Sequence, residues 1–237
     1  MHRNRRRTLM DFPRLSDYLA RLRENNNREW FEANRPEYEA LRTDFSTFVG
    51  EVIEGIGEWD ETVRWVDPKD CIYRIYRDVR FSPDKTPYKT TFSAVISENG
   101  RRGHGPSYYF QVDGGGTLMA GGGVWMPWSK RLAAIREHIA DDPDRLREIL
   151  DEPGFKATFG GLWDIHTLKR PPAGYTDASP LIEIIKLKSF IVERERGVAG
   201  ARDEIRGWIL ESFRAMYPYL LWLRDAVARE AAPDARG

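Results

Sequence analysis

The sequence predicts an α+β fold, with a mainly antiparallel central sheet arranged as a meander and flanked by N-terminal and C-terminal helices. Apolar residues recur every three or four positions before residue 57 and again after residue 127, which is the spacing of helices. From Cys71 the period changes to two, as in strands, and three more strand-like runs follow up to Val124. Short glycine-rich gaps join the later strand-like runs and favour antiparallel pairing in sequence order. Helices segregated from strands indicate the α+β class.

The N-terminal helical region is expected to contain two breaks. An apolar stripe from Phe12 to Leu22 predicts the first helix. The run Asn25–Asn27 interrupts this stripe, and its side chains can cap the free backbone amides of the next helix, which contains Trp30. Pro36 is expected to open a fresh helical stretch, because proline is tolerated in the first turn of a helix.

The extended runs of the middle region define the predicted meander. A Ser82-Pro83-Asp84 turn is expected to follow the first of them. One further strand is predicted much later in the chain. The predicted strands are Cys71–Phe81, Thr90–Glu98, Pro106–Asp113, Thr117–Val124 and Phe190–Glu195.

The C-terminal half is predicted to be mostly helical. Ser129 is expected to cap the first of its helices, and Pro218 to interrupt the last one. Residues 151–179 are expected to be irregular. Four helices are predicted: one that follows Pro127, one from Pro143 to Leu150, one that starts at Ser179-Pro180 and ends at Leu187, and one from Ile205 to Val227.

Length and composition predict one domain. A chain of 237 residues buries roughly 70–75% of its unfolded surface and needs no disulfide staple. We expect residues 11–230 to form a single α+β domain. Residues 1–10, which include four arginines but no apolar stretch after them, are expected to be a disordered basic tail rather than a secretion signal.

Charge and cysteine content limit the classes of partner. Lys plus Arg equals Asp plus Glu at 37 each, whereas a protein devoted to nucleic acid usually carries a basic excess. Nucleic acid is therefore a disfavoured partner that stays open. The single cysteine, Cys71, excludes an internal disulfide and fits a reducing compartment, so we expect a cytoplasmic protein. No apolar run approaches the roughly 18–20 residues that cross a bilayer, so no membrane partner is expected.

The segment from Cys71 to Thr90 concentrates cationic side chains. It contains five cationic and two acidic residues within a neutral protein. Alternation places Arg74, Asp78 and Arg80 on one face, whereas Arg77 points toward the apolar side and must find a carboxylate or a ligand there. We expect this segment to bind a small phosphate- or carboxylate-bearing ligand. The candidate ligand-binding residues are Arg74, Arg77, Arg80, Lys85, Tyr88 and Lys89.

Three other hypotheses remain open for the same segment. The charges could pair with one another and with acidic helix residues, which would make the segment structural. Asp78 or Asp84 could be a general acid or base beside arginines that stabilise an anionic transition state. The cationic segment could also contact nucleic acid together with Arg3–Arg7.

Other candidate sites are weaker. No metal and no cofactor are expected, because the histidines are widely spaced and Cys71 alone cannot anchor zinc. The glycine runs Gly114–Gly116 and Gly121–Gly123 match no phosphate-binding fingerprint and are better explained by a hairpin turn with a bulge. Trp125, directly after the second run, could pack over a cleft, but packing in the core is favoured. Cys71 is expected to be a small buried hydrophobe.

Several motifs together resemble those of the family catalogued as domain of unknown function 2461, whose members are bacterial and fungal. The resemblance covers roughly residues 10–225 and implies a single domain centred on the cationic segment. It implies no reaction, cofactor or catalytic residue. The motifs that carry the resemblance are residues 25–31, residues 74–81, Asp84-Lys85, Pro87-Tyr88-Lys89, residues 121–125 and residues 186–190.

Overall fold

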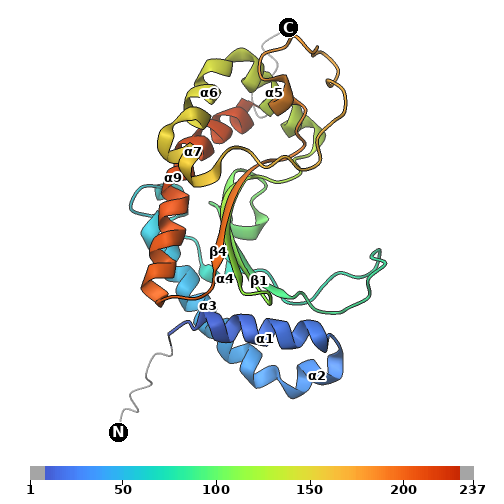
Figure 1. Ribbon diagram of the computed structural model, residues 1–237, viewed down its shortest axis with the longest axis vertical. Helices are drawn as coiled ribbons and strands as arrows, with labels where there is room; N and C mark the ends of the chain where they lie inside the picture. Colours follow the sequence, from blue (N-terminus) through green and yellow to red (C-terminus); the bar gives the residue numbers. More distant parts are fainter. Residues whose placement is uncertain (1–8, 230–237) are drawn as a thin grey trace. The chain divides into compact units, whose positions relative to one another are not determined.

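The computed structural model of the protein describes residues 9–229 (Figure 1). These residues divide into two compact units. The first unit contains the chain up to Arg102, together with Tyr109–Met119 and Glu195–Leu210; the second contains Gly103–Tyr108, Ala120–Arg194 and the residues from Glu211 onward. The expectation of one domain over residues 11–230 stays a prediction, and the arginines of the predicted tail lie outside the described residues.

The sheet confirms the predicted α+β class. Its four strands follow one another in space in the order β1-β2-β3-β4, which is the antiparallel meander that the glycine-rich gaps predicted. The last strand, β4, which was predicted separately, pairs with β3. The bounds of the strands are Thr91–Ile96 for β1, Ser107–Asp113 for β2, Thr117–Val124 for β3 and Phe190–Gly197 for β4.

The N-terminal helices form where the capping residues predicted them. The Asn27 side chain accepts a hydrogen bond from the Trp30 amide at 2.9 Å, which fixes the start of α2, and Pro36 lies in the first turn of α3. The ring of Phe45 on α3 contacts Phe92 and Phe110 of the sheet at centroid distances of 5.4 and 5.5 Å. The helices are α1 Phe12–Glu24, α2 Arg28–Ala33, α3 Arg35–Ile56 and the short α4 Pro68–Cys71.

The C-terminal helices differ from the prediction at their ends. Ser129 is the first helical residue of α5 and not its cap; the N-cap is Trp128, without a side-chain hydrogen bond. The predicted irregular stretch contains α7, which begins where the Glu152 side chain accepts a hydrogen bond from the Phe155 amide at 2.6 Å. The helices are α5 Ser129–Asp141, α6 Pro143–Asp151, α7 Pro153–Phe159, α8 Ile182–Ile185 and α9 Arg202–Ala228.

Two further predictions about helices are wrong. The Ser179-Pro180 pair does not begin a helix; α8 starts after Leu181, which has a left-handed φ of 52°. Pro218 does not interrupt α9, which continues through it. Residues on both sides of this proline, such as Met216 and Leu220, are fully buried, so packing of the helix outweighs the lost backbone hydrogen bond.

The two glycine runs have different structural roles. Gly114–Gly116 form the turn between β2 and β3, as predicted. Gly121–Gly123 lie inside β3, where a Cβ atom on Gly121 or Gly122 would come within 2.3 Å of a backbone oxygen of a neighbouring strand. Close backbone approach within the sheet therefore explains these glycines, and their location does not make them a phosphate cradle.

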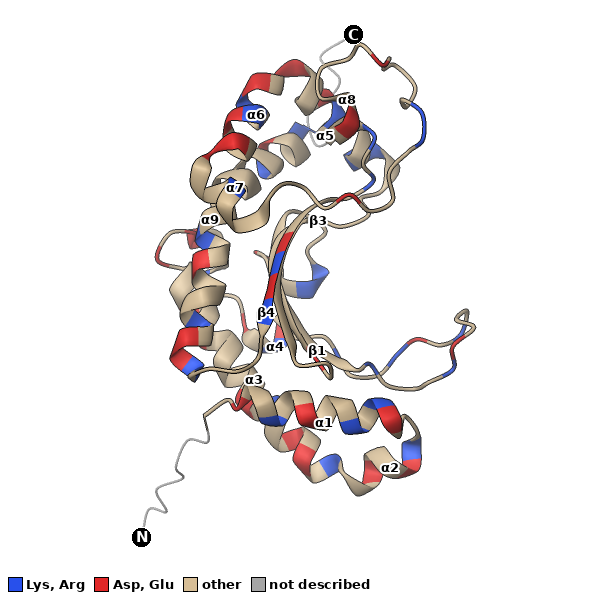
Figure 2. Cartoon of the chain, in the orientation of Figure 1, with Lys and Arg blue, Asp and Glu red and all other residues tan. Residues whose placement is uncertain are grey.

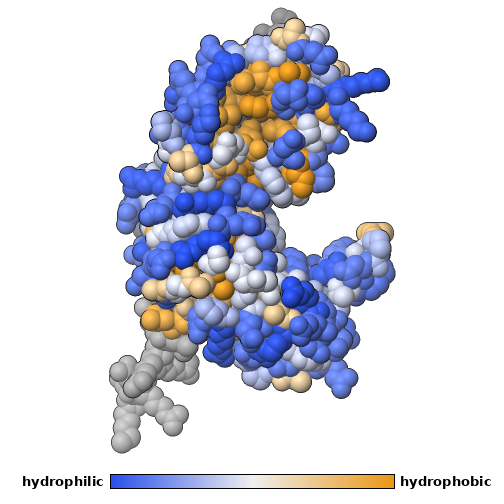
Figure 3. Space-filling model, viewed as in Figure 1, coloured by the Kyte–Doolittle hydropathy of each residue, from blue (hydrophilic) through white to orange (hydrophobic). Residues whose placement is uncertain are grey.

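Charged and apolar residues are distributed differently over the surface. Lys, Arg, Asp and Glu alternate along β4 and are spread over the helices (Figure 2). Apolar residues gather on the face of the second unit that Figure 3 shows, in the region of α5 to α8. Within residues 9–229, none of the helices combines the length and apolar character needed to cross a membrane.

A buried histidine is expected to make the stability of the protein sensitive to pH. His138 packs against the Trp222 ring at a centroid distance of 4.6 Å, and within the described residues neither of its ring nitrogens has a hydrogen-bond partner. Burial, followed by the charge of Arg229, lowers the pKa of His138 below its ordinary value of 6.5. Below that value the unfolded chain takes up a proton that the folded chain resists, so stability should fall as the pH decreases below about 6.5.

The measurement is thermal unfolding between about pH 7 and pH 5 for the wild type and for His138→Phe. The phenylalanine ring retains the stacking but cannot take up a proton, so the variant should lose less of its melting temperature over this range. Equal losses in the two proteins would show that His138 does not cause the sensitivity.

Candidate functional site

The cationic segment forms an arm, defined here as residues 72–89, that projects beyond β1 in Figure 1. Its two limbs are antiparallel: Tyr76 bridges Tyr88, and the amide of Arg77 donates to the carbonyl of Pro87 at 2.9 Å. The predicted strand Cys71–Phe81 is therefore wrong, because this segment makes isolated bridges only and Cys71 ends α4.

Side chains replace ladder hydrogen bonds toward the tip of the arm. The Lys85 ammonium donates to the Val79 carbonyl at 2.9 Å, and the Asp84 carboxylate accepts from the Thr86 amide at 2.9 Å. Such local side-chain bonds compete with regular strand pairing, which explains why the arm is not a hairpin of two strands. Phe81 is 94% exposed at the tip.

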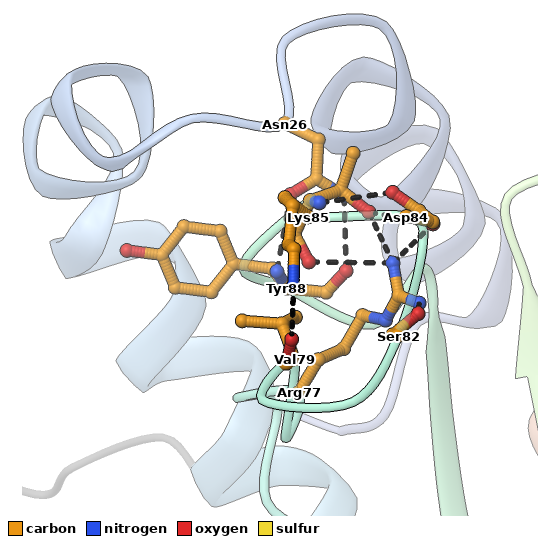
Figure 4. A network of polar contacts seen from close by, with 8 residues as sticks. Asn26, Arg77, Val79, Ser82, Asp84, Lys85 and Tyr88 are labelled. Atoms are coloured by element: carbon orange, nitrogen blue, oxygen red, sulfur yellow. Dashed lines mark hydrogen bonds and ion pairs between the residues drawn. The ribbon is translucent and has the colours of Figure 1, made fainter.

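Arg77 holds the two limbs together (Figure 4). Its guanidinium donates to the Asp84 carboxylate and to the Thr86 hydroxyl, and it approaches the Ser82 hydroxyl at 3.5 Å. The expectation that Arg77 finds a carboxylate is thus confirmed. The backbone amide of Thr86, followed by Arg77, lowers the pKa of Asp84 to about 2. Asp84 is therefore ionised at neutral pH and forms part of a fixed network.

The other acidic residue of the arm is also paired. Asp78 forms an ion pair with Arg80 at 2.6 Å, and the hydrogen bond from Arg80 lowers the pKa of Asp78. Both side chains are exposed. The hypothesis that charges in this segment pair with one another therefore holds for Arg77 and Arg80, although their partners come from the arm itself and not from helices.

A hollow of about 470 Å³ lies at the base of the arm. Asn26, from the loop after α1, fixes one side: its amide nitrogen donates to the Tyr88 carbonyl at 2.9 Å, and its oxygen accepts from the Tyr88 amide at 3.1 Å. The Tyr88 ring stacks on Phe31 of α2 at 4.1 Å, so the arm is anchored at this point. The hollow is lined by Arg23, Asn26, Arg77, Asp84, Thr86, Tyr88, Lys89, Thr90 and Thr91.

Two cations of the hollow have no acidic partner in the described part of the chain. Within residues 9–229, neither Arg23 nor Lys89 forms an ion pair. Lys89 is half-buried, and its ammonium lies 4.8 Å from the centroid of the Tyr73 ring. Burial, followed by the positive charges of Arg74 and Arg101, lowers the pKa of Lys89. Among the described residues, the lining contains three cationic side chains and one carboxylate, that of Asp84.

The structure brings together only part of the predicted ligand set. Arg77, Tyr88 and Lys89 line the hollow, whereas Arg80 and Lys85 bond elsewhere within the arm. Arg74 is exposed, close enough to Lys89 to influence its pKa, and does not line the hollow.

Sequence reasoning missed Arg23 and Asn26. The stretch Asn25–Asn27 signalled a helix boundary, but its link to Tyr88 spans 62 positions in the sequence, and no local pattern predicts a contact across that distance. Within residues 9–229, no three histidine, cysteine or acidic side chains lie close enough to share a metal ion.

The fold and this hollow define the protein as an α+β protein with a cation-lined hollow beneath a cross-linked arm. The chain belongs to the family described as conserved hypothetical protein DUF2461, whose profile matches residues 14–222. This match confirms the resemblance that the sequence motifs carried. A search of curated proteins found no match, and neither did a search of solved structures.

Proposed function

We propose that the hollow at the base of the arm binds a small anionic group, a phosphate or a carboxylate. The observation that carries this proposal is Lys89, a half-buried cation without a carboxylate partner among the described residues. Partly removing an ammonium group from water costs free energy, and the neighbouring charges of Arg74 and Arg101 add to the cost. A bound anion would compensate for the lost hydration of the ammonium and for the repulsion by the two arginines.

The lining supplies the donors that such an anion needs. Lys89 and Arg23 provide charge-assisted hydrogen bonds, which are shorter and stronger than neutral ones. Arg77 is already oriented by Asp84, so little side-chain entropy is lost when a ligand arrives. Thr90 and Thr91 also line the hollow.

The enzyme hypothesis has less support than binding. A general acid or base works best with a pKa near the working pH, whereas the pKa of Asp84 is about 2 and that of Asp78 is lowered by Arg80. The nucleic-acid hypothesis depends partly on Arg3–Arg7, which lie outside the described residues. Neither alternative explains why Lys89 is half-buried.

The proposed location is the cytoplasm. The single cysteine supports a reducing compartment. Cys71 is buried, and burial raises the pKa of its thiol to about 12, so it is a poor nucleophile and a poor partner for disulfide exchange.

Calorimetric titration with inorganic phosphate, a nucleotide and a short dicarboxylate tests the proposal. We expect saturable binding of at least one of them, weakened roughly tenfold in Arg23→Gln, because one charge-assisted hydrogen bond contributes about 1.5 kcal/mol. Arg80→Gln is the matched control, since Arg80 lies outside the hollow and pairs with Asp78. The proposal fails if none of the three ligands binds at millimolar concentration, or if both variants weaken binding equally.

A further inference from the structure

The second unit has an exposed aromatic surface that the proposed function does not use. It consists of Trp125, Trp163 and His166, with Lys188 on a neighbouring segment of backbone, and is called the aromatic platform below. Trp125 is 54% exposed and Trp163 is 37% exposed, so the expectation that Trp125 packs in the core is wrong. The centroid of the Trp125 ring lies 5.9 Å from that of Trp163 and 6.1 Å from that of His166.

The platform is built on three neighbouring backbone segments. The Trp163 amide donates to the Ile191 carbonyl at 2.7 Å, and the Leu168 amide donates to the Lys186 carbonyl at 2.9 Å. In addition, the Met126 amide donates to the Ser189 hydroxyl at 3.0 Å. The segment with Lys188 is therefore hydrogen-bonded both to the segment of Trp125 and to that of Trp163 and His166.

Stability does not explain this arrangement. Met126 and His166 both have positive φ, 41° and 58°, which costs a residue other than glycine free energy. The strained Met126 is held by the fully buried Ser189. A fold that keeps indole rings exposed beside strained backbone is typical of a binding surface.

The charge on the platform indicates the kind of ligand. Lys188 is exposed, and within residues 9–229 it forms no ion pair. Asp164, next to Trp163 in the sequence, accepts a hydrogen bond from the Thr167 hydroxyl. Exposed indole faces stack on planar rings, and a free ammonium attracts a negative group beside such a ring.

We propose that the aromatic platform binds a nucleotide, with the base stacked on Trp125 or Trp163 and the phosphate near Lys188. The ligand is either a free nucleotide or one unit of a single-stranded nucleic acid. The site belongs to the second unit and is independent of the hollow in the first. A neutral sugar or an apolar side chain would leave Lys188 without a role.

The test is a titration of the full chain followed by tryptophan fluorescence. We expect saturable quenching by adenosine 5′-monophosphate and little quenching by ribose 5-phosphate, which has no base. Trp163→Ala and Lys188→Met should each weaken binding roughly tenfold, in line with the contribution of one stacked base. Trp65→Ala is the matched control, because Trp65 is 90% exposed and lies in the first unit.

A short single-stranded oligonucleotide distinguishes the two sources of the ligand. Tighter binding than that of the mononucleotide indicates a nucleic acid; equal or weaker binding indicates a free nucleotide. Quenching that persists in Arg23→Gln separates the platform from the hollow. The proposal is overturned if neither probe gives saturable quenching, or if quenching is unchanged in both Trp163→Ala and Lys188→Met.

Discussion

Gly123→Ala is expected to destabilise the protein by about 3 kcal/mol or more, or to prevent folding. A Cβ atom at this position would lie 1.9 Å from the carbonyl oxygen of Phe190. The oxygen belongs to the adjacent strand β4 and cannot rotate away without breaking the sheet. The φ of Gly123 is 127°, a value that residues with a side chain rarely adopt. Steric overlap and backbone strain therefore add.

Gly116→Ala separates these two causes. Gly116 also has a positive φ, 84°, but no described atom lies within 4 Å of where its Cβ would be. Strain alone should cost about 1–2 kcal/mol at this position. Urea unfolding of both variants gives the comparison. Similar losses in the two variants would mean that the contact between β3 and β4 is looser than the structure has it.

Lys89→Met is expected to abolish most anion binding while leaving the unliganded protein as stable as the wild type, or more stable. The substitution removes a partly buried charge that Arg74 and Arg101 repel. The only favourable contact described for the Lys89 ammonium is with the Tyr73 ring. A residue that lowers stability yet provides affinity is typical of a binding site. A purely structural lysine would give the opposite result, a loss of stability with no effect on binding.

The pH dependence of this variant has a definite sign. The pKa of Lys89 is lowered from its ordinary value of 10.5, so in the alkaline range just below that value the unfolded chain binds more protons than the folded one. The stability of the wild type should therefore rise relative to that of Lys89→Met as the pH increases through this range. At neutral pH Lys89 is protonated in both the folded and the unfolded chain, so the full free-energy cost of partly burying its charge lowers the stability of the wild type.

Lys85→Met is the matched control for Lys89→Met. Lys85 belongs to the same arm but donates to the Val79 carbonyl and does not line the hollow. Phosphate affinity should be unchanged in this variant. Thermal unfolding without phosphate measures the stability of each variant, and the rise in melting temperature on adding phosphate measures its phosphate binding. Equal loss of affinity in the two lysine variants would mean that the general charge of the arm, and not the hollow, attracts anions.

Local patterns were sufficient to predict most of the fold. The stripe from Phe12 to Leu22 and the cap at Asn27 each depend on neighbours within a few residues, and both are confirmed. The later strand-like runs, separated by short glycine-rich gaps, predicted β1 to β3 for the same reason. Pro218 and the start of α8 were predicted wrongly, because burial of α9 and the strained Leu181 depend on tertiary packing.

The candidate site was harder to predict than the fold. Period-two alternation correctly identified Arg77 as a charge in need of a partner, which Asp84 provides. Alternation could not show that Arg80 and Lys85 bond within the arm, since these bonds depend on how the tip turns. Arg23 enters the hollow through contacts between segments distant in sequence, and such contacts leave no local signal.

The most direct test of the central claim is an amide NMR titration of the wild-type protein with inorganic phosphate. The claim predicts saturable shifts confined to the hollow, at Asn26 and at Thr86–Thr91, with the loss of these shifts in Lys89→Met. Saturable shifts at other parts of the chain, or shifts in the hollow that survive in Lys89→Met, would contradict it.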